Sequence, residues 1–197
     1  MELNNSRVKT LNMVKIGILA AIGFVLMFID MPITFLAPSF MKLDASDVPA
    51  LIGGFAMGPI QGIIVQLIKN ILNLSMSSTG GVGEISNFIV GSTIVGVSSL
   101  IYKNKKTFKS AMIGLFLGVV SMAIVATMSN YFFIFPLYSK IMPIETIINM
   151  GAAITGKIVD LKSMMLYAVL PFNLFKGSVN AILTLLLYKR IAPILKK

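Results

Sequence analysis

The feature that most constrains this chain is a series of long apolar segments separated by short polar stretches. The longest, residues 110–138, contains no Asp, Glu, Lys or Arg. A helix needs about 20 mostly apolar residues to cross the ~30 Å hydrocarbon core of a bilayer. Charged residues make up only 12% of the chain, against about 25% in a typical soluble domain. The sequence therefore predicts an integral membrane protein.

The apolar segments predict an all-α, six-helix bundle that forms a single transmembrane domain over residues 1–197. The expected helices cover residues 11–30, 47–57, 59–75, 84–102, 110–138 and 162–189. The second is short, because residues 47–57 rise only roughly 16 Å as a helix, about half of the hydrocarbon core. Gly58 and Pro59 interrupt the apolar run between the second and third helices. The mixed stretch 139–161 suggests a short interfacial piece.

The basic residues predict how the helices are oriented in the membrane. Six crossings place both termini on one side, and that side holds Arg7, Lys9, Lys15, Lys103, Lys105, Lys106, Lys109, Lys189, Arg190, Lys196 and Lys197. The other side holds Lys42, Lys140, Lys157 and Lys162. Basic residues accumulate in cytoplasmic loops, so we expect cytoplasmic N- and C-termini in a multi-pass plasma-membrane protein. The same distribution, at the ends and in one short loop, argues against nucleic acid as a partner despite the net charge of +10.

Several classes of function are excluded by missing residue types. The chain has no cysteine and no histidine, which removes the commonest metal ligand and the usual general base. Residues 151–158 read GAAITGKI, close to a P-loop, but Ile158 stands where Ser or Thr would hold Mg²⁺. We therefore expect no catalytic residue, no metal site and no cofactor in this chain, which is not an enzyme.

Polar residues inside the apolar segments mark a candidate binding site. Asn173, Lys176, Gly177 and Asn180 follow the spacing i, i+3, i+4, i+7, which places them on one face of a helix. Such a polar stripe in a membrane helix must face protein or a water-filled cavity. Polar residues of several segments share the same expected depth, which predicts a pocket open to the outside. The alternative is that these groups only join helices, at about 0.6 kcal/mol per contact.

One motif in the first loop and second segment resembles a known family. Residues 42–55 read KLDASDVPALIGGF and are followed by Gly58–Pro59, Lys69–Asn70 and the sequence GEISNF at 83–88. This pattern is similar to the riboflavin-specific substrate-binding (S) component of energy-coupling factor (ECF) transporters. The resemblance covers nearly the whole chain. It implies capture of riboflavin from outside, with flavin mononucleotide (FMN) or flavin analogues as weaker ligands, and import driven by a transmembrane scaffold subunit and two ATPase subunits.

The resemblance and the expected depth together indicate which residues bind substrate. They are Phe40, Met41, Leu43, Asp44, Ser46, Asp47, Glu84, Asn87, Asn130, Phe135, Asn173, Lys176 and Asn180. Apolar members of this set are expected to line the flavin ring, and Asn130 to contact its edge. Asp47, Glu84, Asn87 and Lys176 are expected to hold the ribityl hydroxyls. The family docks to its scaffold through small residues on the first helix, a role that Gly17, Ala20 and Ala21 would take here.

Two alternative functions remain open from the sequence. The chain could be an S component for another vitamin. It could also be a small secondary transporter that works alone, because interrupted helices are typical of such transporters. No inverted repeat is evident, however, and no row of intramembrane acids indicates proton coupling. Uptake in cells that lack the scaffold and the ATPases distinguishes the two classes.

Overall fold

The apolar segments form helices in the computed structural model, which describes the backbone of residues 2–195 and the side chains of residues 10–188 and Arg190. The single helices are α1 (Glu2–Met27), α2 (Asp47–Met57), α3 (Pro59–Leu74), α4 (Val82–Lys105) and α7 (Ile144–Ala152). Two further helices are composite: α5 (Phe108–Ser129) continues through η1 (Asn130–Ile134) into α6 (Phe135–Tyr138), and α8 (Leu161–Met164) continues through η2 (Met165–Val169) into α9 (Leu170–Leu195).

Four of the described helices are long and apolar enough to cross a membrane. They are Thr10–Met27 within α1, α4, the composite helix Phe108–Tyr138, and Leu161–Tyr188 within the last composite helix. The chain is thus mostly helical with several potential membrane crossings, as the sequence predicted. The α2 helix is the short apolar helix that was expected, and its observed bounds equal the predicted ones.

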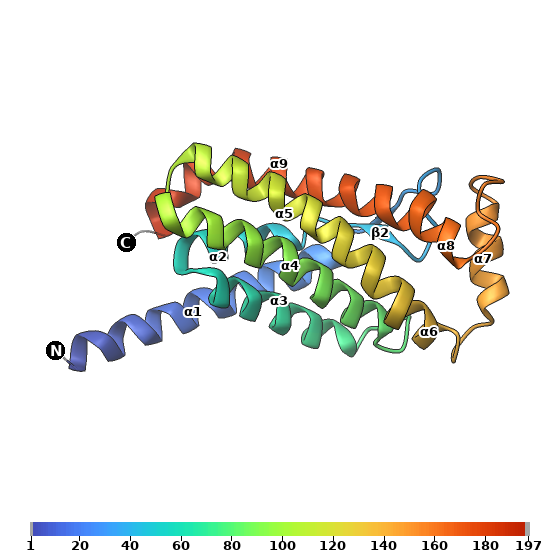
Figure 1. Ribbon diagram of the computed structural model, residues 1–197. Coiled ribbons are helices and arrows are strands. Elements are labelled where there is room, and N and C mark those ends of the chain that lie inside the picture. The colour runs from blue at the N-terminus through green and yellow to red at the C-terminus, as the bar shows by residue number, and fades with distance from the viewer. Residues whose placement is uncertain (1, 196–197) are drawn as a thin grey trace.

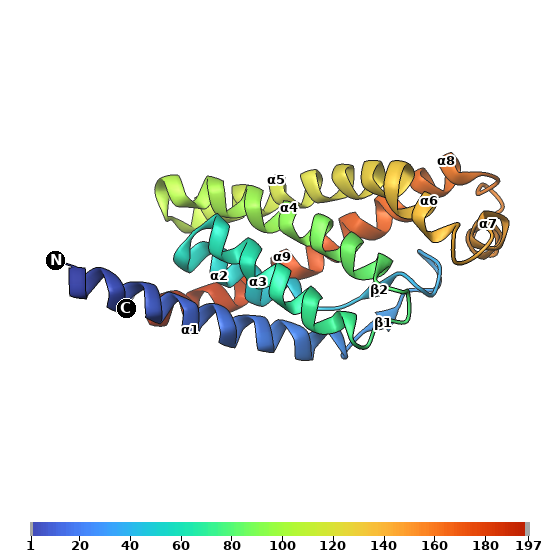
Figure 2. The same cartoon turned by 90° about the horizontal axis from the view of Figure 1, so that it is seen from below.

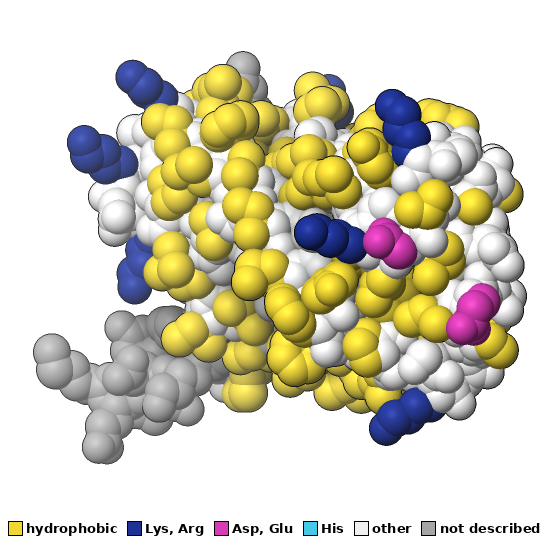
Figure 3. All heavy atoms as spheres, turned by 45° about the vertical axis from the view of Figure 1, so that its right-hand side comes forward, with side chains coloured by type: hydrophobic (Ala, Val, Ile, Leu, Met, Phe, Trp, Pro, Cys, Tyr) yellow, Lys and Arg dark blue, Asp and Glu magenta, His cyan; other side chains and the backbone are white. Residues whose placement is uncertain are grey.

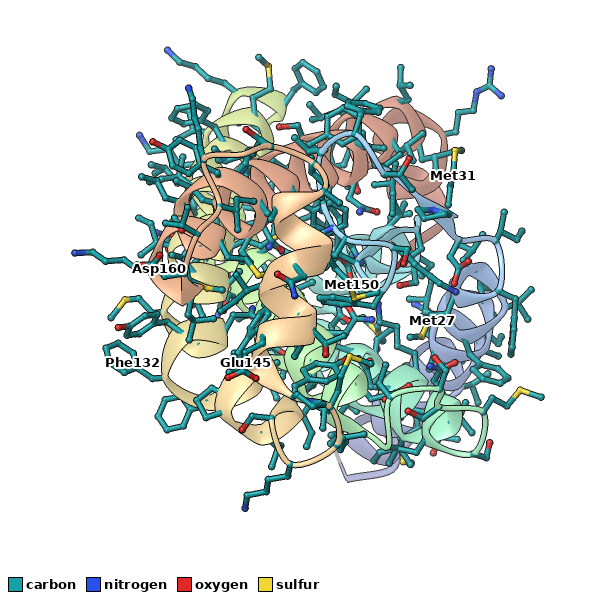
Figure 4. The ribbon with its side chains drawn as sticks, turned by 90° about the vertical axis from the view of Figure 1, so that its right-hand side faces the viewer. Met27, Met31, Phe132, Glu145, Met150 and Asp160 are labelled. Carbon is teal, nitrogen blue, oxygen red and sulfur yellow. The ribbon has the colours of Figure 1, made fainter. Side chains whose placement is uncertain are left out.

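The described residues form seven continuous helical stretches where the sequence predicted six. The additional helix is α7, which lies in the stretch 139–161 where only a short interfacial piece was expected. It begins after Pro143, and its apolar face carries Ile147 into contact with the core, where Ile158 is also buried. Figures 1 and 4 show α7 lying across one end of the bundle.

A two-stranded ribbon is the second departure from the all-α prediction. Strand β1 (Met31–Pro32) pairs with the antiparallel strand β2 (Lys42–Leu43). Lys42 Nζ also lies 2.8 Å from Asp30 Oδ2. Strands of two residues are too short to produce an alternating pattern, so their sequence carries no signal. The ribbon closes the loop between α1 and α2 and brings its two ends together.

Glycine allows α2 and α3 to pack as a tight hairpin. Gly58 adopts φ +115°, a conformation that residues with a side chain rarely adopt, and Pro59 then begins α3. A Cβ atom added to Gly62 would lie 2.8 Å from the Cα of Gly54 and 2.6 Å from Val95 of α4. The break at Gly58–Pro59 therefore turns the chain back, and small residues let the two backbones meet.

Both composite helices contain a π turn, and the two π turns contact each other. A π turn inserts an extra residue into a helix and often occurs at functional sites. Asn130 is the first residue of η1, and Asn173 follows η2 by one turn of α9. The polar residues of these two membrane helices therefore lie beside distortions in the helical backbone.

The two ends of the bundle differ. In Figures 1 and 2, α1 begins and α9 ends at the same end, whereas the ribbon, α6 and α7 lie at the other. Figure 3 shows a side of the molecule covered mostly by apolar side chains, with acidic side chains only in the half away from the chain ends. This surface matches a protein whose middle is embedded in hydrocarbon.

Candidate functional site

A cavity of about 510 Å³ opens among the helix ends next to the ribbon. Its walls come from the end of α1, the ribbon with its loop, the end of α3, the turn that follows it, the start of α4, the π turn η1 with α6, and the start of α9. Eight of the predicted substrate-binding residues line it: Phe40, Met41, Asp44, Glu84, Asn87, Asn130, Asn173 and Lys176. The structure therefore brings together groups that are up to 136 residues apart in the sequence.

The other predicted residues do not line the cavity. They are Leu43, Ser46, Asp47, Phe135 and Asn180. Leu43 belongs to the ribbon, and Phe135 is fully buried with its ring centroid 6.3 Å from that of Phe40. Ser46, Asp47 and Asn180 make hydrogen bonds within the protein.

An ion pair forms part of the cavity wall. Lys176 Nζ donates to Asp44 Oδ2 at 2.8 Å, and the Ser46 backbone N–H donates to Asp44 Oδ1, also at 2.8 Å. Asn180 Nδ2 donates to the backbone carbonyl of Asp44 at 3.1 Å. Burial alone would raise the pKa of Asp44, but attraction from the Lys176 and Lys69 ammonium groups, with hydrogen bonds from Lys176 and Ser46, lowers it to about 2. The carboxylate is therefore ionised throughout the physiological range.

A second ion pair lies fully buried between α2 and α3. Lys69 Nζ donates to Asp47 Oδ1 at 2.7 Å and to Ser46 Oγ at 2.6 Å. Gln66 Nε2 donates to the same Asp47 oxygen at 2.8 Å. The side chains of Lys69 and Asp47 have no exposed surface. Asp47 therefore has a structural role, because its contacts hold the loop that precedes α2 against α3. Its buried position gives no support to the predicted contact between Asp47 and the ribityl hydroxyls.

Glu84 is held by neutral donors from the turn between α3 and α4. Its Oε1 accepts from Asn73 Nδ2 at 2.8 Å, and its Oε2 accepts from Ser77 Oγ at 2.7 Å and from Thr79 Oγ1 at 3.3 Å. Glu84 also lies in the first turn of α4, where the helix dipole favours a negative charge. The carboxylate thus orders the turn and lines the cavity at the same time.

The amides of Asn130 and Asn173 are oriented by their own helices. Asn130 Nδ2 donates to the carbonyl of Ala126, and Asn173 Nδ2 donates to the carbonyl of Val169, each at 2.8 Å. These bonds use the amide nitrogens and leave each Oδ1 to accept a hydrogen bond from a ligand. Both residues line the cavity, so a ligand N–H or O–H group would find two fixed acceptors.

Aromatic rings provide the apolar part of the wall. The ring centroid of Phe40 lies 5.9 Å from that of Tyr138, and Phe172 joins them in lining the cavity. Aromatic pairs at such distances pack in edge-to-face or offset arrangements and suit flat ligands. The site can therefore hold a planar ring system next to groups that form hydrogen bonds.

Many lining residues were missed from the sequence. They are Met27, Phe28, Asp30, Lys42, Asn73, Met76, Ser78, Thr79, Gly83, Ser86, Val90, Ile134, Tyr138 and Phe172. Asn73, Ser78 and Thr79 shortly precede the predicted Glu84 in the sequence, so a search of its neighbourhood would have found them. Met27 and Phe28 carry no such signal, because apolar residues near a helix end are common in membrane proteins.

The small residues of α1 differ in their exposure. Gly17 and Ala21 are exposed, and a Cβ atom added to Gly17 would meet nothing within 4 Å. Ala20 is fully buried inside the protein, so it cannot contact a partner in this conformation. Of the three small residues predicted to contact a partner, Gly17 and Ala21 are thus the exposed ones, and they are four residues apart on one face of α1.

Comparison with known proteins places the chain in a family. The model of the ECF transporter substrate-specific component matches residues 11–188. The chain is 41% identical to the riboflavin transporter RibU of Staphylococcus aureus (strain TCH60), over 100% of this chain and 97% of that protein. It is 31% identical to the riboflavin transporter FmnP of Bacillus subtilis (strain 168), over 94% of each.

A solved structure agrees with this match. The structure described as the S component of a bacterial ECF transporter superposes with a TM-score of 0.78 at 38% sequence identity, covering 96% of this chain and 99% of that one. Family and relatives are components of transporters, in agreement with the prediction that the chain is not an enzyme. The chain belongs to the family of substrate-specific components of ECF transporters.

Proposed function

We propose that this chain binds riboflavin with high affinity at the outer face of the cell membrane and releases it inward as part of an ECF importer. Two relatives that match nearly the whole chain are named riboflavin transporters. At 41% identity over all of this chain, a shared ligand is the simplest expectation. FMN and flavin analogues are proposed as weaker ligands.

The observation that carries the proposal is the mixed chemistry of the cavity. Riboflavin combines a flat, neutral ring system with a chain of hydroxyl groups. The cavity volume of about 510 Å³ lies within the range of small-molecule sites. Phe40 and Phe172 offer apolar walls for the ring, whereas Asn130, Asn87 and Lys176 offer groups that form hydrogen bonds. A wholly apolar or a wholly charged cavity would not suit this ligand.

We place both termini in the cytoplasm and the cavity at the outer side, with six membrane segments crossing or entering the bilayer. The ends of the chain carry most of the basic residues, and basic residues mark the cytoplasmic side. The ribbon and α6, which contribute lining residues to the cavity, lie at the end of the bundle opposite to the start of α1 and the end of α9 (Figure 1). A ligand arriving from outside would therefore reach the cavity directly.

The proposed partners are a transmembrane scaffold subunit and two ATPase subunits. The chain carries no usable P-loop, so the energy for import would come from another subunit. The exposed surface at Gly17 and Ala21 is the proposed contact with the scaffold, because small residues allow two membrane helices to approach closely.

Quenching of flavin fluorescence by the purified chain tests the ligand and its site. Asn130→Ala should weaken riboflavin binding about fivefold, the value of one lost hydrogen bond, and Lys176→Ala should weaken it at least about tenfold because a charged group is lost. Asn149→Ala is the matched control, since Asn149 is exposed on α7 and does not line the cavity. Unchanged affinity in both cavity variants would contradict the proposed site.

Uptake measurements test the partners. Cells that express the chain together with a scaffold and ATPases should accumulate riboflavin, and cells that express the chain alone should not. Robust uptake by the chain alone would instead identify a transporter that works without partners.

A further inference from the structure

The charges that line the cavity do not balance. Three carboxylates, those of Asp30, Asp44 and Glu84, face two ammonium groups, those of Lys42 and Lys176. Two of the acids are paired, because Lys42 lies 2.8 Å from Asp30 and Lys176 lies 2.8 Å from Asp44. Glu84 is the lining acid with no ion pair among the described residues. The cavity therefore carries a surplus of negative charge, which resides on Glu84.

The hydrogen bonds around Glu84 are those that an ionised carboxylate accepts. Ser77 Oγ accepts hydrogen bonds from the backbone N–H groups of Thr79 and Gly81, at 3.2 and 2.9 Å. Its hydroxyl proton is then directed to Glu84 Oε2, 2.7 Å away. The amide of Asn73 can only donate from Nδ2, and it donates to Oε1 at 2.8 Å. Both oxygens of Glu84 are therefore acceptors, and none of these partners neutralises the charge.

We infer that Glu84 is a specificity-determining residue, which lets the cavity accept the neutral flavin and disfavours flavins that carry a phosphate. The inference rests on the proposed function, because it concerns the choice among ligands of the proposed site. A phosphate group brings a charge of about −1.5 to −2 at neutral pH. The neutral ring and hydroxyl chain of riboflavin meet no such repulsion, whereas FMN brings a second anion into a cavity that already has one in excess.

The distance dependence of the Coulomb energy sets the size of the effect. A phosphate that lies within about one Debye length of Glu84 is screened incompletely by salt. Repulsion across roughly 9 Å, at an effective dielectric constant between those of water and a protein surface, corresponds to about 5- to 20-fold in affinity.

The experiment compares riboflavin and FMN on the same purified protein by fluorescence quenching at low salt. The quantity of interest is the ratio of the two dissociation constants, because it cancels losses common to both ligands. In Glu84→Gln the dissociation constant of FMN should fall by about 5- to 20-fold relative to that of riboflavin. Glu145→Gln is the matched control: it removes the same charge from an exposed position on α7 (Figure 4), outside the cavity lining, and should leave the ratio unchanged.

A second variant tests the same inference in the opposite direction. Lys42→Gln leaves Asp30 without its partner and makes the cavity more negative. FMN should then bind less well relative to riboflavin, by a factor of about three or more. This factor is smaller than the one for Glu84→Gln because the Lys42–Asp30 pair is partly exposed to solvent. This variant decides the matter if Glu84→Gln disturbs the turn between α3 and α4 and abolishes binding of both ligands.

The outcomes separate the inference from the proposed function. If the wild-type chain does not bind riboflavin, the proposed function fails. If riboflavin binds and the ratio stays the same in both Glu84→Gln and Lys42→Gln, the function stands and the role of Glu84 is overturned. A shift of the same size in Glu145→Gln would also overturn it, because net charge alone would then explain the effect.

Discussion

At the scale of single residues, the buried pair Lys69–Asp47 is the strongest constraint on the loop before α2. Removing one partner leaves the other charge uncompensated away from water, which costs about 3–5 kcal/mol for a buried pair. We therefore expect Asp47→Asn to lower the free energy of unfolding by about 3 kcal/mol. Titration of mixed micelles with a denaturing detergent, followed by circular dichroism, measures this loss.

The control for that prediction is the exposed pair Lys42–Asp30. Its lysine side chain is 46% exposed, and exposed pairs contribute only about 0–1 kcal/mol. Asp30→Asn should therefore leave the unfolding curve nearly unchanged. Equal stability of Asp47→Asn and the wild type would show that the Lys69 ammonium finds another partner.

The depressed pKa of Asp44 predicts how binding depends on pH. The folded value of about 2 lies below the ordinary value of 3.8, so the ionised form stabilises the folded state. That contribution is complete above about pH 3.8 and is lost only as the pH falls through 2. Asp44 should therefore cause no change in riboflavin affinity between pH 5 and pH 8. The chain also has no histidine, the side chain that ordinarily changes charge in this range. A step in the dissociation constant within this range that Asp44→Asn removes would contradict the prediction.

At the scale of elements, the π turn η1 is expected to set the direction of Asn130. Deletion of Phe133, an exposed residue in this turn, removes the extra residue and should restore a regular α-helix. The helix content should stay the same, but Asn130 should turn away from the cavity, and riboflavin affinity should fall about fivefold or more. Circular dichroism and fluorescence quenching measure the two effects separately.

The matched control for this deletion is Phe133→Ala, which keeps the number of residues in the π turn. It should bind riboflavin as the wild type does, because the side chain is 70% exposed. If the deletion and the substitution bind equally well, η1 has no role in positioning Asn130.

The hairpin of α2 and α3 depends on small residues at its contact. Gly62→Ala places a Cβ atom against the backbone of Gly54 and the carbonyl of Ala50, at 2.8 and 2.9 Å. Backbone atoms cannot move aside, so we expect a loss of about 1–3 kcal/mol in unfolding free energy. Gly17→Ala is the control, because an added Cβ meets nothing there. A stable Gly62→Ala variant would mean that the two helices can separate without cost.

Most helices could be predicted from the sequence, because a membrane imposes long apolar segments with breaks. The α2 helix has the predicted bounds, since Gly58 and Pro59 leave little freedom in where it ends. The ribbon could not be predicted, because strands of two residues show no alternating pattern. A short interfacial piece was expected in the stretch 139–161, and the structure makes it the separate helix α7. The resemblance of the first-loop motif to the ECF family is confirmed by the family match over residues 11–188.

The candidate site was harder to predict, because the sequence shows which residues are polar but not which of them pair. Asp44 and Asp47 lie three residues apart, yet one lines the cavity with Lys176 and the other is buried with Lys69. That difference is set by helices far away in the sequence. Glu84 was predicted to bind substrate and lines the cavity, but its donors in the turn and the lack of an ion pair to it among the described residues appear only in the structure.

At the scale of the whole molecule, we expect riboflavin binding and riboflavin uptake to depend on different surfaces of the chain. Gly17 and Ala21 are exposed small residues of α1, and neither lines the cavity. Gly17→Leu should therefore abolish riboflavin uptake in cells that contain the scaffold and ATPases, and the purified variant should bind riboflavin as the wild type does. Measured uptake equal to that of the wild type would exclude this surface as the docking site.

Titration of the purified protein with riboflavin shows whether this chain alone forms a riboflavin site. We expect saturable quenching of flavin fluorescence with one ligand bound per chain, and no competition from thiamine or biotin in excess. Absence of saturable quenching, or displacement of riboflavin by one of these other vitamins, would contradict this expectation.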